Sequence, residues 1–429
     1  MAVLAAASLL VTQFFRPKLP APPVTGNIRV SPPVEQILRT SCYNCHSNET
    51  RLPWFDRIAP AYWIAVADVK QARQHVNFSE FDKVPEAQQR GILFESVSQM
   101  EAGLMPLKRY ELVHPESRVS PEALATLKQY LVSSGRDTPP ATPQQESAVA
   151  QQYDAWRTRT TRAEVRPAPN GLAFLPDYPN WRAISTTERF DNNTLRVILG
   201  NEVAVTAIRD RRINPWPDGT AFAKVAWNQL ANAAGELRPG TFIQVEFMVK
   251  DARKYASTKG WGWGRWKGAD LQPYGSSSDF TAECTGCHTP MSNNDYVFTT
   301  PIQPIDGLPH QPLQWKVIAS SVDRGDGTMS TLFGNDAAVQ HARESLDSAY
   351  PAGAVLSLVT WAQRADEHWF GARIPGELRT VEFVTVGATP QAASYLRYSG
   401  SPLQSVTPAP ETRDSRIRAI LGQRASLMP

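Results

Sequence analysis

The stretch DGTAFAKVAW, residues 218–227, places one lysine, Lys224, inside a segment that otherwise has the composition of a buried β-strand. Burying an ammonium group costs several kcal/mol unless the group is paired, neutralised or chemically consumed. The alternative is that Lys224 lies on an exposed strand face, with its carbon chain against the protein and its charge in water. Any structure of this segment must therefore account for the charge of Lys224.

The sequence around Lys224 has a counterpart further along the chain. A shift of 134 residues relates Trp181 to Trp315, Gly200-Asn201 to Gly334-Asn335, Pro217 to Pro351, Gly219 to Gly353 and Trp227 to Trp361. After a slip of two residues, Val-Glu-Phe at 245–247 matches Val-Glu-Phe at 381–383. This series predicts two copies of one fold, over residues 165–300 and 301–410. Each copy is expected to be α+β and dominated by antiparallel sheet, with a short helix after the Gly-Asn pair.

The two predicted copies differ at the position of the lysine. With the period-two alternation of a strand, Phe222, Lys224 and Ala226 share one face. The corresponding face of the second copy is mostly apolar and has Leu358 in place of the lysine. We therefore expect Lys224 to point inward.

All four cysteines lie in two short motifs, C-Y-N-C-H and C-T-G-C-H. The spacing C-x-x-C-H is typical of covalent c-type haem, because both thiols bond to the porphyrin and the adjacent histidine becomes an axial iron ligand. Two alternatives, a redox-active cysteine pair and a four-cysteine zinc site, leave both histidines unexplained. The predicted attachment residues and iron ligands are Cys42, Cys45 and His46 for one haem, and Cys284, Cys287 and His288 for the other.

The N-terminal residues indicate a chain that leaves the cytoplasm. Residues 2–15, AVLAAASLLVTQFF, are apolar but shorter than the roughly 20 residues needed to span a bilayer. Together with the proline-rich residues 16–24 they predict a signal peptide or membrane anchor over residues 1–24, in preference to a buried helix. Haem attachment of this kind takes place outside the cytoplasm, so we expect a periplasmic or otherwise extracytoplasmic protein, with membrane association through the N-terminus as an option.

Length and charge limit the remaining function classes. A chain of 429 residues predicts several domains, since single cores rarely exceed about 300 residues. The 44 basic and 41 acidic side chains give a net charge of +3 without a basic stripe, so we expect no nucleic-acid partner.

Residues 28–136 have a helical pattern and predict a small all-α haem module. Helices are expected over residues 66–76 and 121–134, the second with Ser120 as its N-cap. The order CYNCHSNETRLPWF, IAPAYW, NFSEF, LMPLKRY and HP within this module resembles the haem-binding domain of small exported cytochromes c.

Met105 is the predicted sixth ligand of the first haem iron. It precedes a proline and follows Gly103 closely, and a thioether opposite a histidine raises the potential and suits electron transfer. Met105 is otherwise a core methionine, with His75, His114 and Met100 as the competing ligands.

Two segments between and after these modules are expected to lack a core of their own. Residues 137–164 are rich in proline and glutamine with few apolar anchors, which predicts a linker. Residues 411–429 are expected to form a C-terminal tail.

Most of residues 180–300 resemble cytochrome P-460. The resemblance rests on ILGNEVAVTAI, NPWPDGTAFAKVAW, FIQVEFMVKDARKYASTKGWGWGRW and AECTGCH, in this order. It implies a β-rich fold that pairs as homodimers, a c-type haem with an extra covalent bond from a lysine nitrogen, and oxidation of hydroxylamine. The matching lysine is Lys224, so the resemblance implies that its amine is bonded to the haem and is no free cation.

The resemblance also implies two further catalytic residues. Arg196 matches a distal arginine, although it is otherwise read as a surface charge at the start of a helix. The acidic residue upstream of the second haem motif is taken as Asp279, with Glu283 as its competitor.

Taken together, these features predict a multidomain chain with an N-terminal all-α cytochrome c-like module and two α+β cytochrome P-460-like repeats, the second without haem. The implied activity is hydroxylamine oxidation to nitrous oxide or nitric oxide at an open iron site, with a carboxylate as proton acceptor. Electrons would pass to the first haem and then to a downstream redox protein. The second repeat is expected to dock on the first as a pseudo-dimer, in place of a second subunit.

Two other functions stay open. The first is a cytochrome that binds nitric oxide or another gas without turnover, which an apolar distal pocket would favour. The second is a plain dihaem electron-transfer protein, with both irons six-coordinate and Lys224 unmodified.

Overall fold

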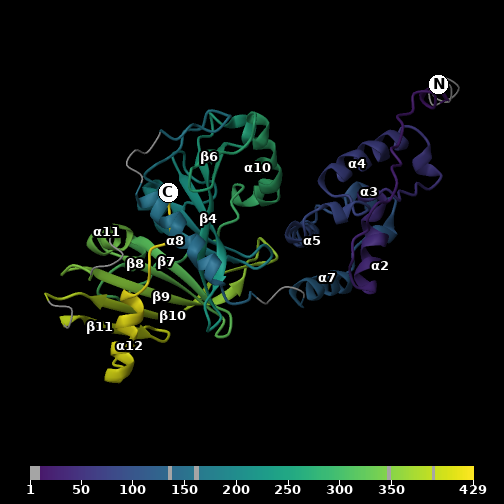
Figure 1. The fold of residues 1–429 in the computed structure, drawn as a ribbon. Helices are drawn as coiled ribbons and strands as arrows, with labels where there is room; N and C mark the ends of the chain where they lie inside the picture. The colour runs from purple at the N-terminus through teal and green to yellow at the C-terminus, as the bar shows by residue number, and fades with distance from the viewer. Residues whose placement is uncertain (1–9, 134–137, 159–163, 345–348, 389–391) are drawn as a thin grey trace. The chain divides into compact units, whose positions relative to one another are not determined.

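The computed structural model describes residues 10–133, 138–158, 164–344, 349–388 and 392–429, which belong to two compact units (Figure 1). The first unit is Met1–Arg136 and the second is Asp137–Pro429. Residues 1–9 of the predicted leader lie outside the described residues. Across the described ranges, no helix has both the length and the apolar character needed to cross a membrane.

The first unit is helical, as predicted. Its helices are α2 (Pro32–Ser41), α3 (Tyr43–His46), α4 (Ala61–His75), α5 (Glu86–Glu101), α6 (Lys108–Glu111) and α7 (Pro121–Ser133), with 3-10 turns η1 (Phe55–Arg57), η2 (Phe81–Lys83) and η3 (Pro115–Ser117). The hydroxyl of Ser120 accepts a hydrogen bond from the Ala123 N–H at 3.2 Å, so Ser120 caps α7 as expected. The helix expected over residues 66–76 is α4, which begins earlier, at Ala61.

The first unit buries one face of each long helix. Val34 and Leu38 are one turn apart on α2, as are Leu127 and Leu131 on α7, and all four are at most 3% exposed. Each such side chain stabilises the fold by about 1.5–3 kcal/mol relative to an exposed position. Cys42 is the residue that ends α2, so the first haem motif begins where this packed helix stops.

The second unit contains one antiparallel sheet with 12 strands in the described residues. The strands are β1 (Arg182–Arg189), β2 (Thr194–Gly200), β3 (Ala221–Ala231), β4 (Glu236–Lys250), β5 (Trp261–Lys267), β6 (Gln272–Pro273), β7 (Lys316–Asp323), β8 (Thr328–Gly334), β9 (Val355–Ala365), β10 (Ala372–Thr385), β11 (Ser394–Ser399) and β12 (Gln404–Val406). The antiparallel character that the sequence predicts is therefore present.

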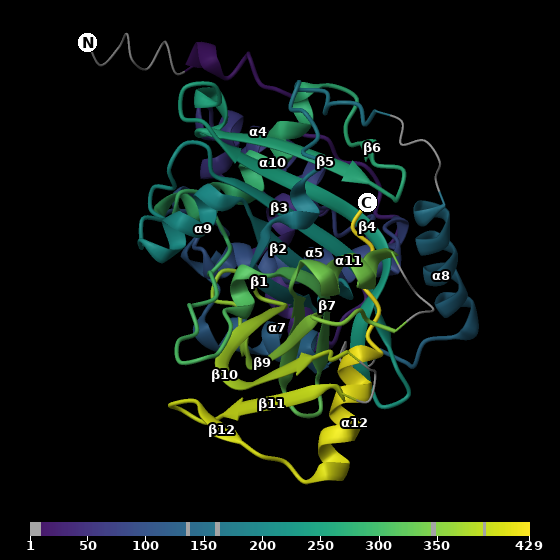
Figure 2. The same ribbon diagram turned by 90° about the vertical axis from the view of Figure 1, so that its left-hand side faces the viewer.

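The strands of the two predicted repeats join in this single sheet, which corrects the expectation that each copy forms a sheet of its own and docks on the other. Strand β4 pairs with β7, and β10 pairs with β1, so the order β1-β2-β3-β4-β7-β8-β9-β10 returns to its start (Figure 2). The reason is that each half has edge strands whose backbone groups need partners, and the other half supplies them.

The two halves have the same order of elements. The first contains β1, β2, α9 (Glu202–Arg209), β3 and β4, and the second contains β7, β8, α11 (Asp336–Glu344), β9 and β10. Asn201 begins α9: its Oδ1 accepts from the Ala204 N–H at 3.0 Å and its Nδ2 donates to the Gly219 carbonyl at 2.8 Å. Asn335 makes the equivalent bonds in the second half, at 3.0 and 2.9 Å. The short helix predicted after each Gly-Asn pair is therefore confirmed.

Helix α8 (Pro143–Arg157) lies in the segment that was predicted to be a linker. Thr142 begins the helix with a capping box. Tyr153 is buried in the core, and the Gln152 side chain bonds both backbone groups of Phe242, accepting at 2.7 Å and donating at 3.2 Å. The linker prediction for residues 137–164 is wrong over this helix, because its mostly polar composition conceals the few side chains that anchor it.

The last residues of the chain are part of the core as well. Helix α12 (Pro410–Leu421) packs against β9 and β10, and Leu427 is 5% exposed. The Trp227 Nε1–H donates to the Leu427 carbonyl at 2.8 Å, and the Tyr178 hydroxyl donates to the carbonyl of Pro429 at 2.7 Å. Residues 411–429 are therefore an integral element of the second unit and no free tail.

Candidate functional site

The second C-x-x-C-H motif lies on helix α10 (Thr281–His288), which packs on β5. His288 Nδ1 donates a hydrogen bond to the Tyr296 carbonyl at 2.7 Å, and its ring lies 4.5 Å from Trp263 and 4.9 Å from Phe298 between centroids. Burial lowers the pKa of His288 to about 4, so the imidazole is neutral near pH 7. With Nδ1 engaged as a donor, Nε2 keeps the lone pair that an axial iron ligand needs.

The two thiols of this motif, Cys284 and Cys287, are half-buried and form no disulfide. Cys284 packs against an apolar cluster of the first half that includes Trp263 and Phe222. Burial raises the pKa of Cys284 to about 11, so this group is a protonated thiol near pH 7. Such thiols are available for thioether bonds and are poor metal ligands as they stand.

Lys224 is paired with an acid on the next strand. It lies on β3 directly opposite Glu246 of β4, and its Nζ is 2.6 Å from the Glu246 Oε2. Arg265 of β5 is opposite Glu246 in the following strand pair, and its Nε is 3.3 Å from Oε1. Three charged side chains from adjacent strands therefore meet on one sheet face. Because Lys224 is only 30% exposed and Glu246 19%, this pairing accounts for an ammonium group within the strand.

The charges of this cluster act on one another and on the haem motif. Burial lowers the pKa of Lys224. Burial alone would raise the pKa of Glu246, but the charges of Lys224 and Arg265 and the Lys224 hydrogen bond outweigh it and hold the pKa at about 2. The same charges influence the pKa of Cys284 and of His288, so the cluster adjoins the haem motif. Glu246 is therefore an ionised carboxylate next to a haem ligand.

Arg196 belongs to the same group. It lies within β2, opposite Ala226 of β3, on the face that also carries Lys224. Its Nε donates to the Thr194 hydroxyl at 3.3 Å. Burial lowers the pKa of Arg196, and Glu246 and Cys287 are among the charges that act on it. A surface position at the start of a helix is thus not where this arginine lies.

The two acids considered from the sequence lie elsewhere. Asp279, on η6 (Ser278–Phe280), is exposed and bonds the hydroxyl of Ser277 at 2.9 Å. Glu283 is exposed on α10 and accepts from the Tyr274 hydroxyl at 3.0 Å. The structure does not bring either one to Lys224. The acid that it does bring there, Glu246, was visible in the sequence only as part of the repeated Val-Glu-Phe.

The segment that holds His288 in place is itself held by the second half of the sheet. His368 Nδ1 donates to the Phe298 carbonyl at 2.6 Å, and the Trp369 ring meets the Phe298 ring edge-on at 5.8 Å. Arg189 in turn lies over Trp369 at 4.3 Å. Residues of the β9–β10 loop therefore support the haem ligand, a contribution that nothing in the sequence pattern indicated.

The first C-x-x-C-H motif spans the end of α2 and the short helix α3. His46 Nδ1 donates to the Val76 carbonyl at 3.3 Å, which leaves Nε2 as the potential ligand atom. Burial lowers the pKa of His46 and raises those of Cys42 and Cys45, to about 12 and about 11. The donor set is thus the same as in the second motif.

The candidates for the sixth ligand of the first iron differ in their surroundings. Met105 lies in the loop after α5 and is 39% exposed. His114 is buried, and its Nε2 lies 2.8 Å from Asp56 while its Nδ1 lies 3.3 Å from Glu116. Because both ring nitrogens of His114 are engaged, it is not free to bind iron. Met105 stays the predicted ligand.

The residues present at both motifs fit a covalently bound haem. Each motif offers two free thiols and a neutral histidine whose Nδ1 is already a donor. Within the described ranges, no group of three or more His, Cys, Asp or Glu side chains is arranged to hold a metal ion directly, so a zinc site is not formed there.

Two family models match the chain over the regions that carry these motifs. The model for cytochrome P460 matches residues 175–299 and 309–412, together more than half of the 429 residues. The chain belongs to the cytochrome P460 family. A model for a haem-binding domain matches residues 7–133, the region of the first motif. No curated protein matches the chain.

Membership of the cytochrome P460 family makes this chain a haem protein. Both motifs lie in matched regions, which confirms the resemblances drawn from the sequence for the first unit and for the region around Lys224. The second matched segment covers β7 to β12, in the half that has no cysteine.

Proposed function

We propose that this chain is an exported dihaem c-type cytochrome that oxidises hydroxylamine at a haem crosslinked to Lys224. The observation that carries the proposal is the cluster of Lys224, Glu246 and Arg265 beside the second haem motif. A protein that only transfers electrons has no need of an ionised carboxylate and several cations at the edge of a haem. Cytochrome P460 family membership supports a haem enzyme of this type.

Cys284, Cys287 and His288 would hold the catalytic haem, and Cys42, Cys45, His46 and Met105 would hold the other. When bound, the haem supplies an iron that binds hydroxylamine through nitrogen and takes up its electrons. The chain contributes a neutral, oriented histidine on one side of the iron. It also contributes the apolar packing around Cys284, which keeps the site from bulk water.

Glu246 is the proposed proton acceptor. Oxidation of two hydroxylamine molecules to nitrous oxide and water releases four protons and four electrons, so the site needs a base. Glu246 is ionised near pH 7 because the adjacent cations hold its pKa at about 2. Loss of the Lys224 charge on crosslinking would remove one of those cations and bring the carboxylate closer to the range where a general base works. Arg196 would orient the substrate from the same face.

Lys224 is the proposed crosslinking residue. Burial lowers the pKa of its amine, and the Glu246 carboxylate at 2.6 Å is positioned to take up its proton. The crosslink would replace one N–H bond of Lys224 and one C–H bond of the porphyrin with an N–C bond, so its formation would need a two-electron oxidant such as a peroxide, which would take up the two electrons. Asp279, which the resemblance implied as the catalytic acid, lies on η6 and bonds Ser277 there, so Glu246 and not Asp279 would accept the protons.

The two halves of the second unit are proposed to be copies of one ancestral domain. The shared element order, the matching Asn caps and the two matched segments support this duplication. The second half would then occupy the place that a second subunit occupies in a homodimer. Electrons would pass to the first haem and on to a downstream redox protein.

Peptide mass spectrometry tests the proposal. Protein made in a host that matures c-type haem is digested, and a peptide containing Lys224 is expected to be joined to the haem peptide of Cys284 and Cys287. Lys224→Leu is expected to abolish this species and to lower hydroxylamine turnover at least about tenfold. The matched control is Lys267→Leu, on β5 with an exposed side chain, which should leave both unchanged.

The two other functions are outcomes of the same experiment. Two haems with a free Lys224 peptide and no turnover would reject hydroxylamine oxidation. Binding of nitric oxide to the ferrous protein would then favour a gas-binding cytochrome, and two low-spin, six-coordinate haems would favour a plain electron carrier.

A further inference from the structure

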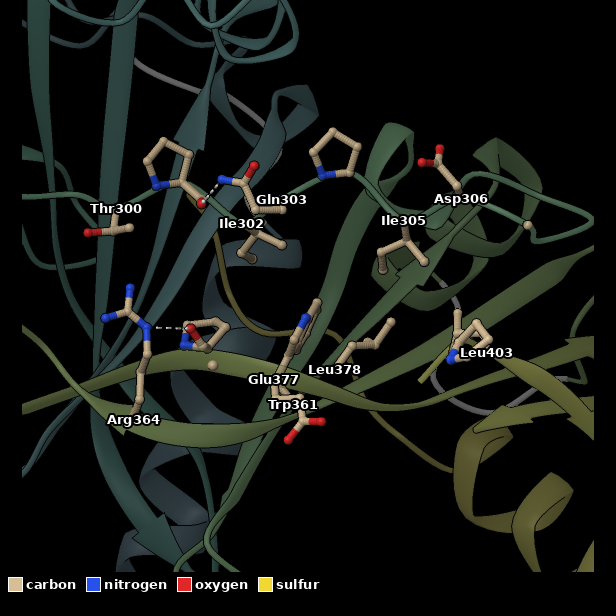
Figure 3. A pocket seen from close by; sticks show the side chains of 16 residues that line it. Thr300, Ile302, Gln303, Ile305, Asp306, Trp361, Arg364, Glu377, Leu378 and Leu403 are labelled. Carbon is tan, nitrogen blue, oxygen red and sulfur yellow. Dashed lines mark hydrogen bonds between the residues drawn. The ribbon is translucent and has the colours of Figure 1, made fainter. Parts of the chain in front are cut away.

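A cavity of about 890 Å³ that the proposed function does not use opens beside the second half of the sheet. Its walls are strands β7 to β11, the start of β4, helix α8 and the end of α12 with the C-terminal residues. This volume lies within the range of small-molecule sites in proteins, about 300–1,000 Å³. A smaller hollow of about 720 Å³ lies between residues 300–307 and β9–β10, and half of its lining is proline or aliphatic (Figure 3). Its arginine, Arg364, is already engaged: it donates to the Pro375 carbonyl at 3.3 Å and lies 3.8 Å from Glu367.

The cavity corresponds by strand register to the haem side of the first half. Glu382 of β10 is paired with Leu358 of β9 on one side and with Arg397 of β11 on the other, and all three residues contact the cavity. In the first half, Glu246 of β4 is paired in the same way with Lys224 of β3 and with Arg265 of β5. The acid and the arginine are therefore present in both halves, while the lysine and the cysteines are not.

The acid of the cavity already has its counter-charge. Arg416 of α12 grips Glu382 with two hydrogen bonds, at 2.8 and 2.6 Å, and the Tyr395 hydroxyl also donates to it. The Glu382 side chain is only 4% exposed. The pair is thus neutral as a whole, and α12 supplies the cation that Lys224 supplies in the other half.

Arg397 is left as the uncompensated charge. It has no ion pair to any residue in the described ranges, and its Nε is buried there without a hydrogen-bond partner. A buried guanidinium N–H without a partner is costly, and a planar oxygen anion matches its geometry. Of the other acids of the lining, Glu236, Asp323 and Asp326 are near the β7–β8 turn. Their distance from the Leu358 position can be counted along β8. Leu332 of β8 pairs with Leu358, and Thr328 of β8 pairs with Asp323. These two positions on β8 are four residues apart, which is about 13 Å. The remaining two acids of the lining, Glu146 and Asp154 of α8, are paired with Arg238 and Arg157.

The space beside Arg397 is only partly polar. Leu358 and Ala319 provide an apolar floor, and Ser330 and Thr360 provide hydroxyl groups, which bond each other at 2.8 Å. Arg424 also lines the cavity, but its side chain is exposed. Among the described residues, Arg397 is thus the lining cation with a buried, unpartnered N–H, which matches a single negative charge, and the apolar floor matches a carbon body. We propose that this cavity binds a small organic carboxylate, with the carboxylate on Arg397 and its apolar part over Leu358.

Calorimetric titration of the full-length haem protein tests the site. The probe is benzoate, with the uncharged amide benzamide and inorganic phosphate as comparisons. Wild type is expected to bind one benzoate. Its affinity for benzamide is expected to be lower by about tenfold or more, since benzamide lacks the charge. Arg397→Gln should weaken benzoate by about tenfold or more. The matched control, Arg379→Gln, lines the same cavity but is paired with Glu377 at 3.3 Å, and should change the affinity less than about twofold.

Three results would overturn the proposal. They are no benzoate binding by wild type at about 10 mM, an unchanged affinity in Arg397→Gln, and phosphate binding as tight as benzoate. If Arg397→Gln does not fold, Leu358→Phe is the substitute variant. The larger side chain narrows the same cavity, so the affinity for benzoate must fall in that variant. Haem absorbance and hydroxylamine turnover are expected to stay unchanged in both variants, which separates this site from the haem.

Discussion

Glu246 is the residue that balances the haem-side charges of the second unit. One carboxylate faces Lys224 at 2.6 Å and Arg265 at 3.3 Å, and Arg196 is close enough to act on its pKa. The corresponding acid, Glu382, is paired with Leu358 on the neighbouring strand, and its cationic partner is Arg416 of α12. A buried acid is therefore retained in both halves, and the partner that neutralises it differs.

In protein whose Lys224 is not crosslinked, Glu246→Gln is expected to destabilise the second unit by about 3 kcal/mol at pH 7, because Lys224 and Arg265 lose their counter-charge. The pKa of Glu246 is about 2 in the fold against an ordinary 4.5, so its contribution is present above about pH 4.5 and is lost as the pH falls towards 2. Urea unfolding at pH 7, 5 and 3 should show the difference between wild type and variant shrinking over that window. A difference independent of pH would contradict this account.

The pair of His114 and Asp56 has a similar role in the first unit. Both side chains are at most 9% exposed, and the Nε2–Oδ2 distance is 2.8 Å. Asp56→Ala is expected to lower the stability of this unit by about 2 kcal/mol, because a buried imidazole loses its partner. The control is Glu116→Ala, since Glu116 contacts the same ring at 3.3 Å but is 64% exposed, and it should cost less than about 0.5 kcal/mol. Denaturant unfolding of the haem-loaded protein, followed by haem absorbance, measures the unfolding free energy of both variants. Equal losses of stability in both would contradict a stabilising role for the His114–Asp56 pair.

At the scale of elements, α8 is held by the buried Tyr153, by the ion pair of Glu146 with Arg238 and by the side chain of Gln152. Gln152 satisfies the N–H and the C=O of Phe242, where the pairing of β3 with β4 shifts register. A register shift frees backbone groups, so a partner from outside the ladder is needed.

Gln152→Ala is expected to cost about 1–2 kcal/mol through the loss of these two hydrogen bonds. Gln151→Ala is the matched control: the neighbouring glutamine is exposed and bonds only Ser147 on the same helix. Thermal unfolding measures the change in stability of each variant relative to wild type, and this change should be close to zero for the control. Similar losses for both would mean that helix propensity, and not the bonds to Phe242, is responsible.

The elements differ in how well their sequences predict them. The short helices after the Gly-Asn pairs, the Ser120 cap and both haem motifs depend on residues within a few positions, so their patterns were sufficient. The nature of α8 was not predictable in this way, because the groups that stabilise it, Phe242 and the core around Tyr153, are far away in sequence. The same holds for α12, whose partner Glu382 lies on β10.

At the scale of the molecule, the two halves of the second unit share one sheet and one main core, so we expect them to unfold together. Its main core draws on both halves, from Trp227 and Phe247 to Phe333 and Phe383, and includes Leu427 from the C-terminal residues. A shared core and a shared sheet do not allow one half to unfold while the other stays folded.

Calorimetry should accordingly show one transition for the second unit. Leu427→Ala is expected to lower that transition as a whole, by about 3 kcal/mol, because the side chain is buried beneath both halves. Leu396→Ala, on β11 and 43% exposed, is the control and should cost less than about 1 kcal/mol. Two separate transitions, of which only one moves in Leu427→Ala, would contradict joint unfolding of the two halves.

The sequence by itself determined the haem motifs, the order of helical and β-rich regions, the repeated elements and the family, because each depends on residue types at short and regular spacing. Only the tertiary structure decided that Glu246 and not Asp279 faces Lys224, that the halves share one sheet, and that the C-terminal residues enter the core. These features depend on which strands lie side by side. Strand pairing joins residues far apart in the chain, and no local pattern specifies the partner.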